Sequence, residues 1–74
     1  MQSVVRSDPQ VLGGVPCFAG TRVPVRSLFD HLDGGYTVEY FLAQFPTVKR
    51  EQVHTLLDAV RRETEERALA EVRG

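Results

Sequence analysis

Apolar residues recur at helical spacing in three successive segments of the second, larger part of the chain. The first segment carries Val25, Leu28, Phe29 and Leu32, the second Val38, Phe41, Leu42 and Phe45, and the third Val53, Leu56, Leu57 and Val60. Positions i, i+3, i+4 and i+7 lie on one face of an α-helix, so each segment predicts an amphipathic helix. Three such helices predict a small helical core.

Proline, glycine and threonine mark the expected ends of these helices. Pro24 precedes the first helix, where a missing N–H is harmless, and Gly34-Gly35 follows it as a left-handed C-cap requires. Thr37 is expected to cap the second helix and Pro46 to stop it. Thr47 is expected to cap the third helix at once, which leaves only about three residues for the turn between the two helices.

The first part of the chain lacks this periodicity and alternates short β-prone runs with turn residues. Short strands are predicted at Val4–Ser7, Pro16–Phe18 and Arg22-Val23, with turns at Asp8-Pro9 and Ala19–Thr21. Strands this short are not stable alone in water, so they must pack on the helices or pair with a second chain. The predicted fold is mainly α with a small N-terminal β-hairpin or sheet and a three-helix helix-turn-helix core, homeodomain-like or winged.

Beyond Val60 the apolar pattern gives way to alternating charges. Opposite charges stand four residues apart, a spacing that supports a helix in water, in the pairs Arg61 and Glu65, Arg62 and Glu66, and Glu63 and Arg67. We therefore divide the chain into a domain over residues 1–62 and a C-terminal helical extension, or arm, over residues 63–74. The extension either frays towards its end or lays Leu69 and Val72 into a groove of a partner.

Composition narrows the classes of function. Nine basic and ten acidic residues give a net charge of −1, so nucleic-acid binding would depend on a local patch. The single cysteine, Cys17, excludes an internal disulfide and fits a reducing cytoplasm. His31 and His54 have no partner at metal-binding spacing, and the chain has no nucleophile elbow or phosphate loop. We expect a cytoplasmic, non-enzymatic protein with no catalytic residues, no metal, no cofactor and no membrane segment.

A basic pair stands where the third helix is expected to begin. Lys49 and Arg50 lie in its first turn, where cations oppose the helix dipole at a cost of about 0.3–1 kcal/mol, and Gln52 follows. The second helix of a helix-turn-helix presents its N-terminal turn to DNA, so these three residues are candidate contacts to phosphates or base edges. The alternative interpretation is an exposed, solvated pair without a partner.

Two residues near the first helix have open roles. Arg22 either pairs with Asp30 or Asp33 and fixes the sheet against the helix, or stays exposed for a partner. His31 precedes the core position Leu32 and is expected at the boundary of the core.

An ordered set of motifs runs through residues 4–60. Gly-x-Pro at 14–16, Gly-Thr-Arg-x-Pro-Val at 20–25 and x-Phe-Pro-Thr at 44–47 occur in this order. With them the chain resembles the bacterial and archaeal family catalogued as domain of unknown function 433. The resemblance implies a small helix-turn-helix protein that acts as a VapB-like antitoxin of a type II toxin–antitoxin module. Such a protein neutralises a PIN-like nuclease toxin and can repress its own operon.

The predicted DNA contact combines this resemblance with the residue pattern. Family members often carry acidic residues after the residue that caps the last helix, where this chain has Lys49-Arg50. A homodimer would present two copies of the third helix to successive major grooves of operator DNA, with Lys49, Arg50 and Gln52 as the reading residues.

The predicted toxin contact lies in the extension and follows how other antitoxins work. Arg67, Leu69, Val72 and Arg73 are its candidate residues, and Arg67 or Arg73 would compete with the cation at the acidic site of the toxin. Two alternatives stay open. The chain could be a stand-alone DNA-binding transcriptional regulator, or an interaction module that binds the toxin without touching DNA.

Overall fold

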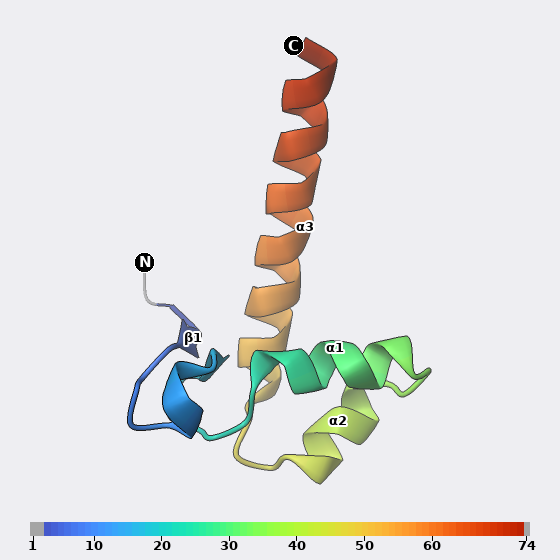
Figure 1. Ribbon diagram of the computed structural model, residues 1–74. Coiled ribbons are helices and arrows are strands. Elements are labelled where there is room, and N and C mark those ends of the chain that lie inside the picture. Colours follow the sequence, from blue (N-terminus) through green and yellow to red (C-terminus); the bar gives the residue numbers. More distant parts are fainter. Residues whose placement is uncertain (1–2, 74) are drawn as a thin grey trace.

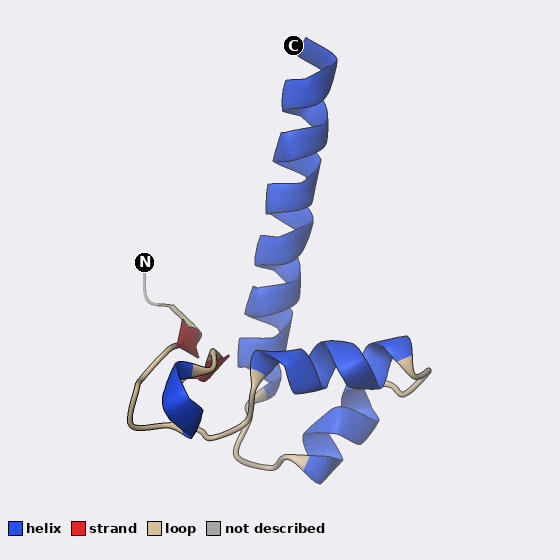
Figure 2. Cartoon of the chain, viewed as in Figure 1, coloured by secondary structure: helices blue, strands red, loops and turns tan. Residues whose placement is uncertain are grey.

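The structure, a computed structural model, describes the backbone of residues 3–73. In chain order its elements are β1 (Val5–Arg6), the 3₁₀ turn η1 (Leu12–Gly14), β2 (Cys17–Phe18), α1 (Val25–Asp33), α2 (Val38–Gln44) and α3 (Arg50–Arg73). Helices α1 and α2 lie beside the first turns of α3, and the rest of α3 extends away from them (Figures 1 and 2). The predicted fold class is confirmed: the described residues are mainly helical, with a two-stranded N-terminal sheet. We call the rest of the described chain, residues 3–58, the head.

The sheet is a short antiparallel pair. Arg6 of β1 stands opposite Cys17 of β2. The chain then turns at Gly20, whose φ of 77° suits a residue without a Cβ. It returns past β2, where the Phe18 N–H donates to the Val23 carbonyl at 3.0 Å. The return segment forms an isolated bridge rather than the predicted strand over residues 22–23.

Residues 7–16 connect β1 to β2 as a loop held by its own hydrogen bonds. Ser7 Oγ donates to the Gly14 carbonyl, and the Gly14 N–H donates to the Val11 carbonyl at 3.1 Å. Among the described non-glycine residues, Leu12 alone has a positive φ, of 51°. A left-handed backbone costs an L-residue about 1–2 kcal/mol. The Leu12 side chain is 46% exposed, so burial offsets little of that cost.

The predicted ends of α1 and α2 are confirmed. Pro24 directly precedes α1, and Gly35 follows it with a φ of 89°. Thr37 caps α2, because its Oγ1 accepts a hydrogen bond from the Tyr40 N–H at 3.0 Å. The helix ends before Pro46. The local signals for these two helices therefore decide their bounds.

Helix α3 begins later than predicted, and Thr47 does not cap it. The helix starts at Arg50, so residues 45–49 form the turn after α2. Val48 is buried in the core, with 4% of its surface exposed. Because the backbone at Val48 is placed by this contact, the helix begins two residues later, at Arg50. The Lys49 N–H then donates to Gln52 Oε1 at 3.0 Å. A glutamine three residues into the helix thus satisfies the backbone donor that precedes it.

The core lies where the three helices meet the sheet. Its buried cluster consists of Phe18, Val23, Leu28, Phe41, Val48 and Val53. The predicted apolar faces of the helices are largely confirmed, because the partly buried residues around this cluster are Val25, Leu32, Val38, Leu42, Phe45, Leu56 and Leu57. Phe29 and Val60 were expected on these faces, but they are 36% and 41% exposed. Val60 lies beyond the last turn of α3 that reaches the head.

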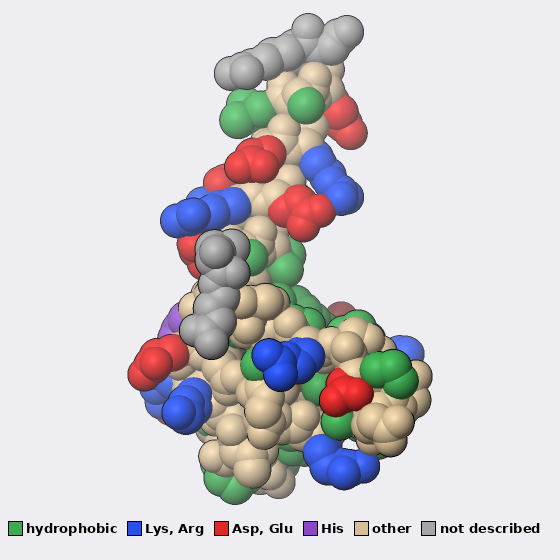
Figure 3. Space-filling model, turned by 90° about the vertical axis from the view of Figure 1, so that its left-hand side faces the viewer, with side chains coloured by type: hydrophobic (Ala, Val, Ile, Leu, Met, Phe, Trp, Pro, Cys, Tyr) green, Lys and Arg blue, Asp and Glu red, His purple; other side chains and the backbone are tan. Residues whose placement is uncertain are grey.

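The second half of α3 is exposed along its whole described length. Every residue from Ala59 to Val72 is exposed, and the helix of 24 residues spans about 36 Å. Acidic and basic side chains alternate along it (Figure 3). Two predicted ion pairs form, Arg61 with Glu65 and Arg67 with Glu63, whereas Arg62 contacts Asp58 at 3.0 Å rather than Glu66. The helix runs unbroken across the boundary expected at residue 62, so that division stays a prediction.

Within residues 3–73, no helix has both the length and the apolar character that a membrane crossing needs.

Candidate functional site

The three residues predicted to contact DNA have different environments. Arg50 forms two hydrogen bonds with Glu39 of α2, one of them 2.6 Å long between Nη2 and Oε2. Gln52 Nε2 donates to the Ala19 carbonyl at 3.0 Å, while its Oε1 accepts from Lys49. The Lys49 side chain is exposed and has no ion-pair partner among the described residues. The side chains of Arg50 and Gln52 are thus hydrogen-bonded within the head, whereas the side chain of Lys49 is not.

The pair of Glu39 and Arg50 joins the start of α2 to the start of α3. The hydrogen bond from Arg50 lowers the pKa of Glu39, and the same contact raises the pKa of Arg50. Both side chains are more than half exposed, so water screens the pair. The pair nevertheless links the two helices directly.

Replacing Arg50 with methionine is expected to raise the pKa of Glu39 towards its ordinary value of 4.5. Because the folded-state pKa of Glu39 is the lower one, the pair stabilises the protein above the unfolded pKa. That stabilisation is lost as pH falls through the folded pKa.

The measurement is an NMR titration of the Glu39 carboxyl group. Arg22→Met is the matched control and should leave that titration unchanged; an unchanged titration in Arg50→Met would disprove the pair.

Three basic side chains form no ion pair among the described residues. They belong to Arg6, Arg22 and Lys49. The other basic residues with described side chains are all paired with carboxylates, namely Arg26, Arg50, Arg61, Arg62 and Arg67. Arg22 is exposed, and the alternative pairing with Asp30 or Asp33 does not form: Asp30 lies 3.7 Å from Arg26 instead. We call Arg6, Arg22 and Lys49 the cationic face.

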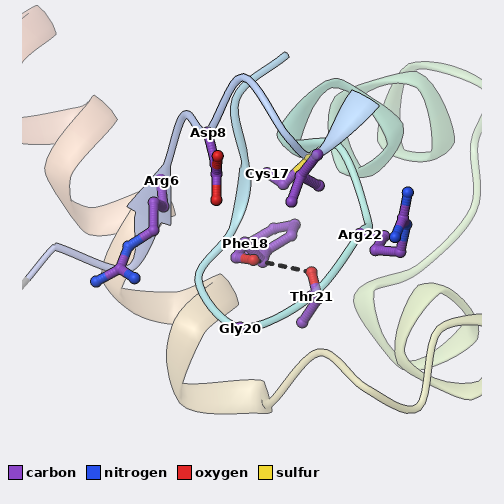
Figure 4. A pocket seen from close by; sticks show the side chains of 8 residues that line it. Arg6, Asp8, Cys17, Phe18, Gly20, Thr21 and Arg22 are labelled. Atoms are coloured by element: carbon purple, nitrogen blue, oxygen red, sulfur yellow. Dashed lines mark hydrogen bonds between the residues drawn. The ribbon is translucent and has the colours of Figure 1, made fainter. Parts of the chain in front are cut away.

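The cationic face surrounds the turn at Gly20. Arg6 and Arg22 line opposite sides of a hollow of about 230 Å³ with this turn at its lower edge (Figure 4). Lys49 lines a second, shallow hollow that shares Gly20. The hydrogen bond from Gln52 to Ala19 attaches the start of α3 to the same turn. Lys49 thus lies beside the start of α3, and Arg6 and Arg22 lie across the turn at Gly20.

One acidic side chain, Asp8, also lines the first hollow. Its Oδ1 accepts a hydrogen bond from the Gln10 N–H at 2.9 Å, which places the carboxylate in the loop after β1. Thr21 Oγ1 donates to the Phe18 carbonyl at 2.9 Å and accepts from the Val23 N–H, so it shapes the turn. Arg6 and Arg22 carry guanidinium groups, which can donate hydrogen bonds to an anion.

The residues predicted to contact a toxin lie on the exposed end of α3. Arg67 is paired with Glu63 at 2.5 Å. Leu69 and Val72 are 56% and 85% exposed, and their spacing of three residues places them near one side of the helix. Arg73 ends the helix, and its side chain lies outside what the structure describes. Leu69 and Val72 thus form an apolar edge of α3 that is exposed and lies away from the head.

An aromatic cluster occupies the end of the head where α1 turns into α2. His31 is half-buried, as predicted, and its Nδ1 lies 2.7 Å from the Ser27 carbonyl. Tyr36 and Tyr40 stack with ring centroids 4.6 Å apart. No three His, Cys, Asp or Glu side chains of residues 3–73 come together as a possible metal site.

Comparison with known proteins agrees with the motifs. Over 52 residues the chain is 36% identical to "Uncharacterized protein y4eO" of Sinorhizobium fredii (strain NBRC 101917 / NGR234), a match that covers 70% of this chain and 24% of that protein. The chain therefore spans about a quarter of the length of that relative. No solved structure matches the chain. The family described as "Protein of unknown function (DUF433)" matches residues 5–58, from β1 to the last turn of α3 that packs on the head. The chain belongs to the DUF433 family.

Proposed function

We propose that this protein is a VapB-like antitoxin of a type II toxin–antitoxin module. It binds and neutralises a PIN-like nuclease toxin, and as a homodimer it binds operator DNA and represses its own operon. The observation that carries the proposal is the division of α3 into two parts. Its first turns belong to a helix-turn-helix head beside the cationic face, and its second half extends into solvent.

The cationic face supports the DNA half of the proposal. Phosphate contacts supply much of the affinity of DNA-binding proteins, and they need cations that are not already neutralised. Arg6, Arg22 and Lys49 meet that requirement, and they line two hollows that share Gly20. Arg50 and Gln52 are reassigned from reading DNA to positioning α3, since both are hydrogen-bonded within the head.

The exposed end of α3 supports the toxin half. Leu69 and Val72 offer apolar area, and Arg67 and Arg73 supply guanidinium groups that can pair with carboxylates. The described side chains here are held only by contacts within the helix, so a partner can cover them without disturbing the head. In this proposal the arm docks on the toxin by its apolar edge and directs an arginine at the acidic site.

A gel-shift titration with the DNA upstream of its own gene tests the DNA half. Replacing Arg6, Arg22 and Lys49 together with glutamate is expected to weaken binding at least about 100-fold at 0.1 M salt and to flatten the salt dependence. Replacing Arg26, Arg61 and Arg62 with glutamate changes the net charge equally and serves as the control. Equal losses in both variants would mean that bulk charge acts, and unchanged binding in the first variant would remove the cationic face from the proposal.

A toxin-binding module that does not touch DNA is the second candidate. The net charge of −1 and the engagement of Arg50 and Gln52 within the head favour it. Such a module would show no salt-dependent retardation of DNA even in complex with the toxin.

A stand-alone regulator would instead bind its operator tightly with no toxin present.

A further inference from the structure

The outer edge of β1 carries a residue, Val5, whose backbone groups face away from the sheet. Among the described residues, β2 is the one strand that pairs with β1. The Ala19 N–H, on the β2 side, donates to the carbonyl of Val4 at 2.8 Å. Because backbone groups alternate in direction along an antiparallel strand, the N–H and the carbonyl of Val5 point away from β2. Figure 1 shows β1 at the side of the head opposite to α2.

The Ser3 side chain binds both of these backbone groups. Its Oγ donates to the Val5 carbonyl at 2.7 Å and accepts from the Val5 N–H at 3.2 Å. A residue of a neighbouring strand would exchange the same two hydrogen bonds with Val5. Ser3 is exposed, so its hydroxyl can leave without disturbing the core. The edge of β1 is therefore satisfied by a side chain that a strand can displace.

The residues around Val5 suit antiparallel pairing with a second copy of the same strand. In a register centred on Val5, the two copies of this residue lie opposite each other and exchange both hydrogen bonds. Val4 then stands opposite Arg6, whose aliphatic stem can cover the valine, and Ser3 stands opposite Ser7. Within residues 3–7 this register sets no like charges directly opposite each other. Such a contact is isologous and closes as a two-fold dimer.

We propose that β1 pairs with β1 of a second copy, so that two sheets of two strands become one sheet of four. The inference rests on the homodimer of the proposed function and names its interface. A sheet of two strands is marginally stable in water, whereas four strands support one another. The register also sets Arg6 of the two copies at diagonal positions, about 7–8 Å apart. Cations related by a two-fold axis suit a duplex whose half-sites have the same symmetry.

A strand of another protein, such as the toxin, would find the same two backbone groups at this edge. The second copy is favoured because its flanking residues match, with Val4 against the stem of Arg6 on both sides of the axis. A contact through so short a strand is smaller than a standard interface, so we expect a weak dimer.

Sedimentation equilibrium of the full chain, from about 1 μM to about 1 mM, tests this interface because weak dimers form only at high concentration. Val5→Pro removes the N–H that faces away from β2, and proline is tolerated in an edge strand. It should weaken self-association at least about tenfold, since both exchanged hydrogen bonds are lost. Val5→Thr keeps the N–H and the branched side chain, and as the matched control it should associate like the wild type.

Two further measurements separate the interface from a structural role of β1. Ser3→Ala should strengthen self-association about threefold or more, because the competing hydroxyl is gone. A serine that only stabilised the strand would have the opposite effect. The amide proton of Val5 in the wild type should exchange more slowly as the protein concentration rises. That measurement needs no substitution, so it decides the question even where Val5→Pro destabilises the sheet.

A dimer that Val5→Pro leaves intact overturns the β1 interface and keeps the homodimer of the proposed function. A wild-type chain that stays monomeric at about 1 mM overturns both the interface and the homodimer. Gel shifts and neutralisation assays on the same protein then decide the DNA and toxin halves independently. Loss of toxin binding in Val5→Pro with unchanged self-association would assign the edge to a strand of the toxin instead.

Discussion

Replacing Phe41 with alanine is expected to lower the free energy of unfolding by about 3–5 kcal/mol. Phe41 is fully buried, and its ring centroid lies 4.9 Å from Phe45, 6.0 Å from Phe18 and 5.4 Å from His31. It therefore joins α2 to α1 and to the sheet. At roughly 0.05–0.15 kcal/mol per residue, a chain of 74 residues has about 4–11 kcal/mol in total. The loss therefore removes a large part of the total stability, and the variant should unfold at a clearly lower urea concentration than the wild type.

Urea denaturation followed by circular dichroism measures this loss. Tyr40→Ala is the matched control, since it truncates the preceding aromatic residue of the same helix, which is 42% exposed. Its cost should stay below about 1 kcal/mol, apart from the lost stacking on Tyr36. A Phe41→Ala protein with the urea midpoint of the wild type would show that the core does not centre on Phe41.

Ending the chain after Glu63 is expected to abolish neutralisation of the toxin while leaving the head folded. The deletion removes residues whose described side chains are all exposed, so the melting temperature should change by only a few degrees, on the order of what surface changes produce. It also removes Leu69 and Val72, the apolar edge of the arm. Thermal melts report on the fold, and cleavage of RNA by the purified toxin with added antitoxin reports on neutralisation.

Two full-length variants sharpen this experiment. Leu69→Ser with Val72→Ser removes the apolar edge but keeps the helix, and should weaken neutralisation at least about tenfold. Ala59→Ser with Ala70→Ser alters exposed small residues of the same helix and should have no effect. Full neutralisation by the shortened chain would place the inhibitory contact in the head and remove the arm from the proposal.

The bounds of α1 and α2 could be predicted because their determinants are local. Thr37 caps α2 through its own side chain, and Gly35 takes the left-handed conformation that ends the turn after α1. The start of α3 could not be predicted in the same way. Thr47 is as good a local cap as Thr37, but burial of Val48 in the core delays the helix to Arg50. A tertiary contact overrode the local preference.

The candidate site depends on tertiary contacts even more than the start of α3 does. Lys49-Arg50 was identified from the sequence as a basic pair, but Arg50 meets Glu39 eleven residues earlier, a contact that exists only once α2 and α3 are packed. Gln52 reaches Ala19 across 33 residues. Arg6 was not selected at all, because a lone arginine in a two-residue strand carries no local signal. Its place beside Arg22 follows from the sheet and the turn at Gly20.

Helix α3 is one element in geometry but two in the way it melts. Up to Leu57 one face of the helix packs on the core through Val53, Leu56 and Leu57, so those turns should open only when the head unfolds. From Ala59 onward the helix depends on its own backbone and on neighbouring charges, and an isolated segment of this length is marginal in water. Amide protons of the last turns should therefore exchange through local opening, independently of the head. A partner that covered this segment would lengthen the cooperative unit along an existing helix without creating new secondary structure.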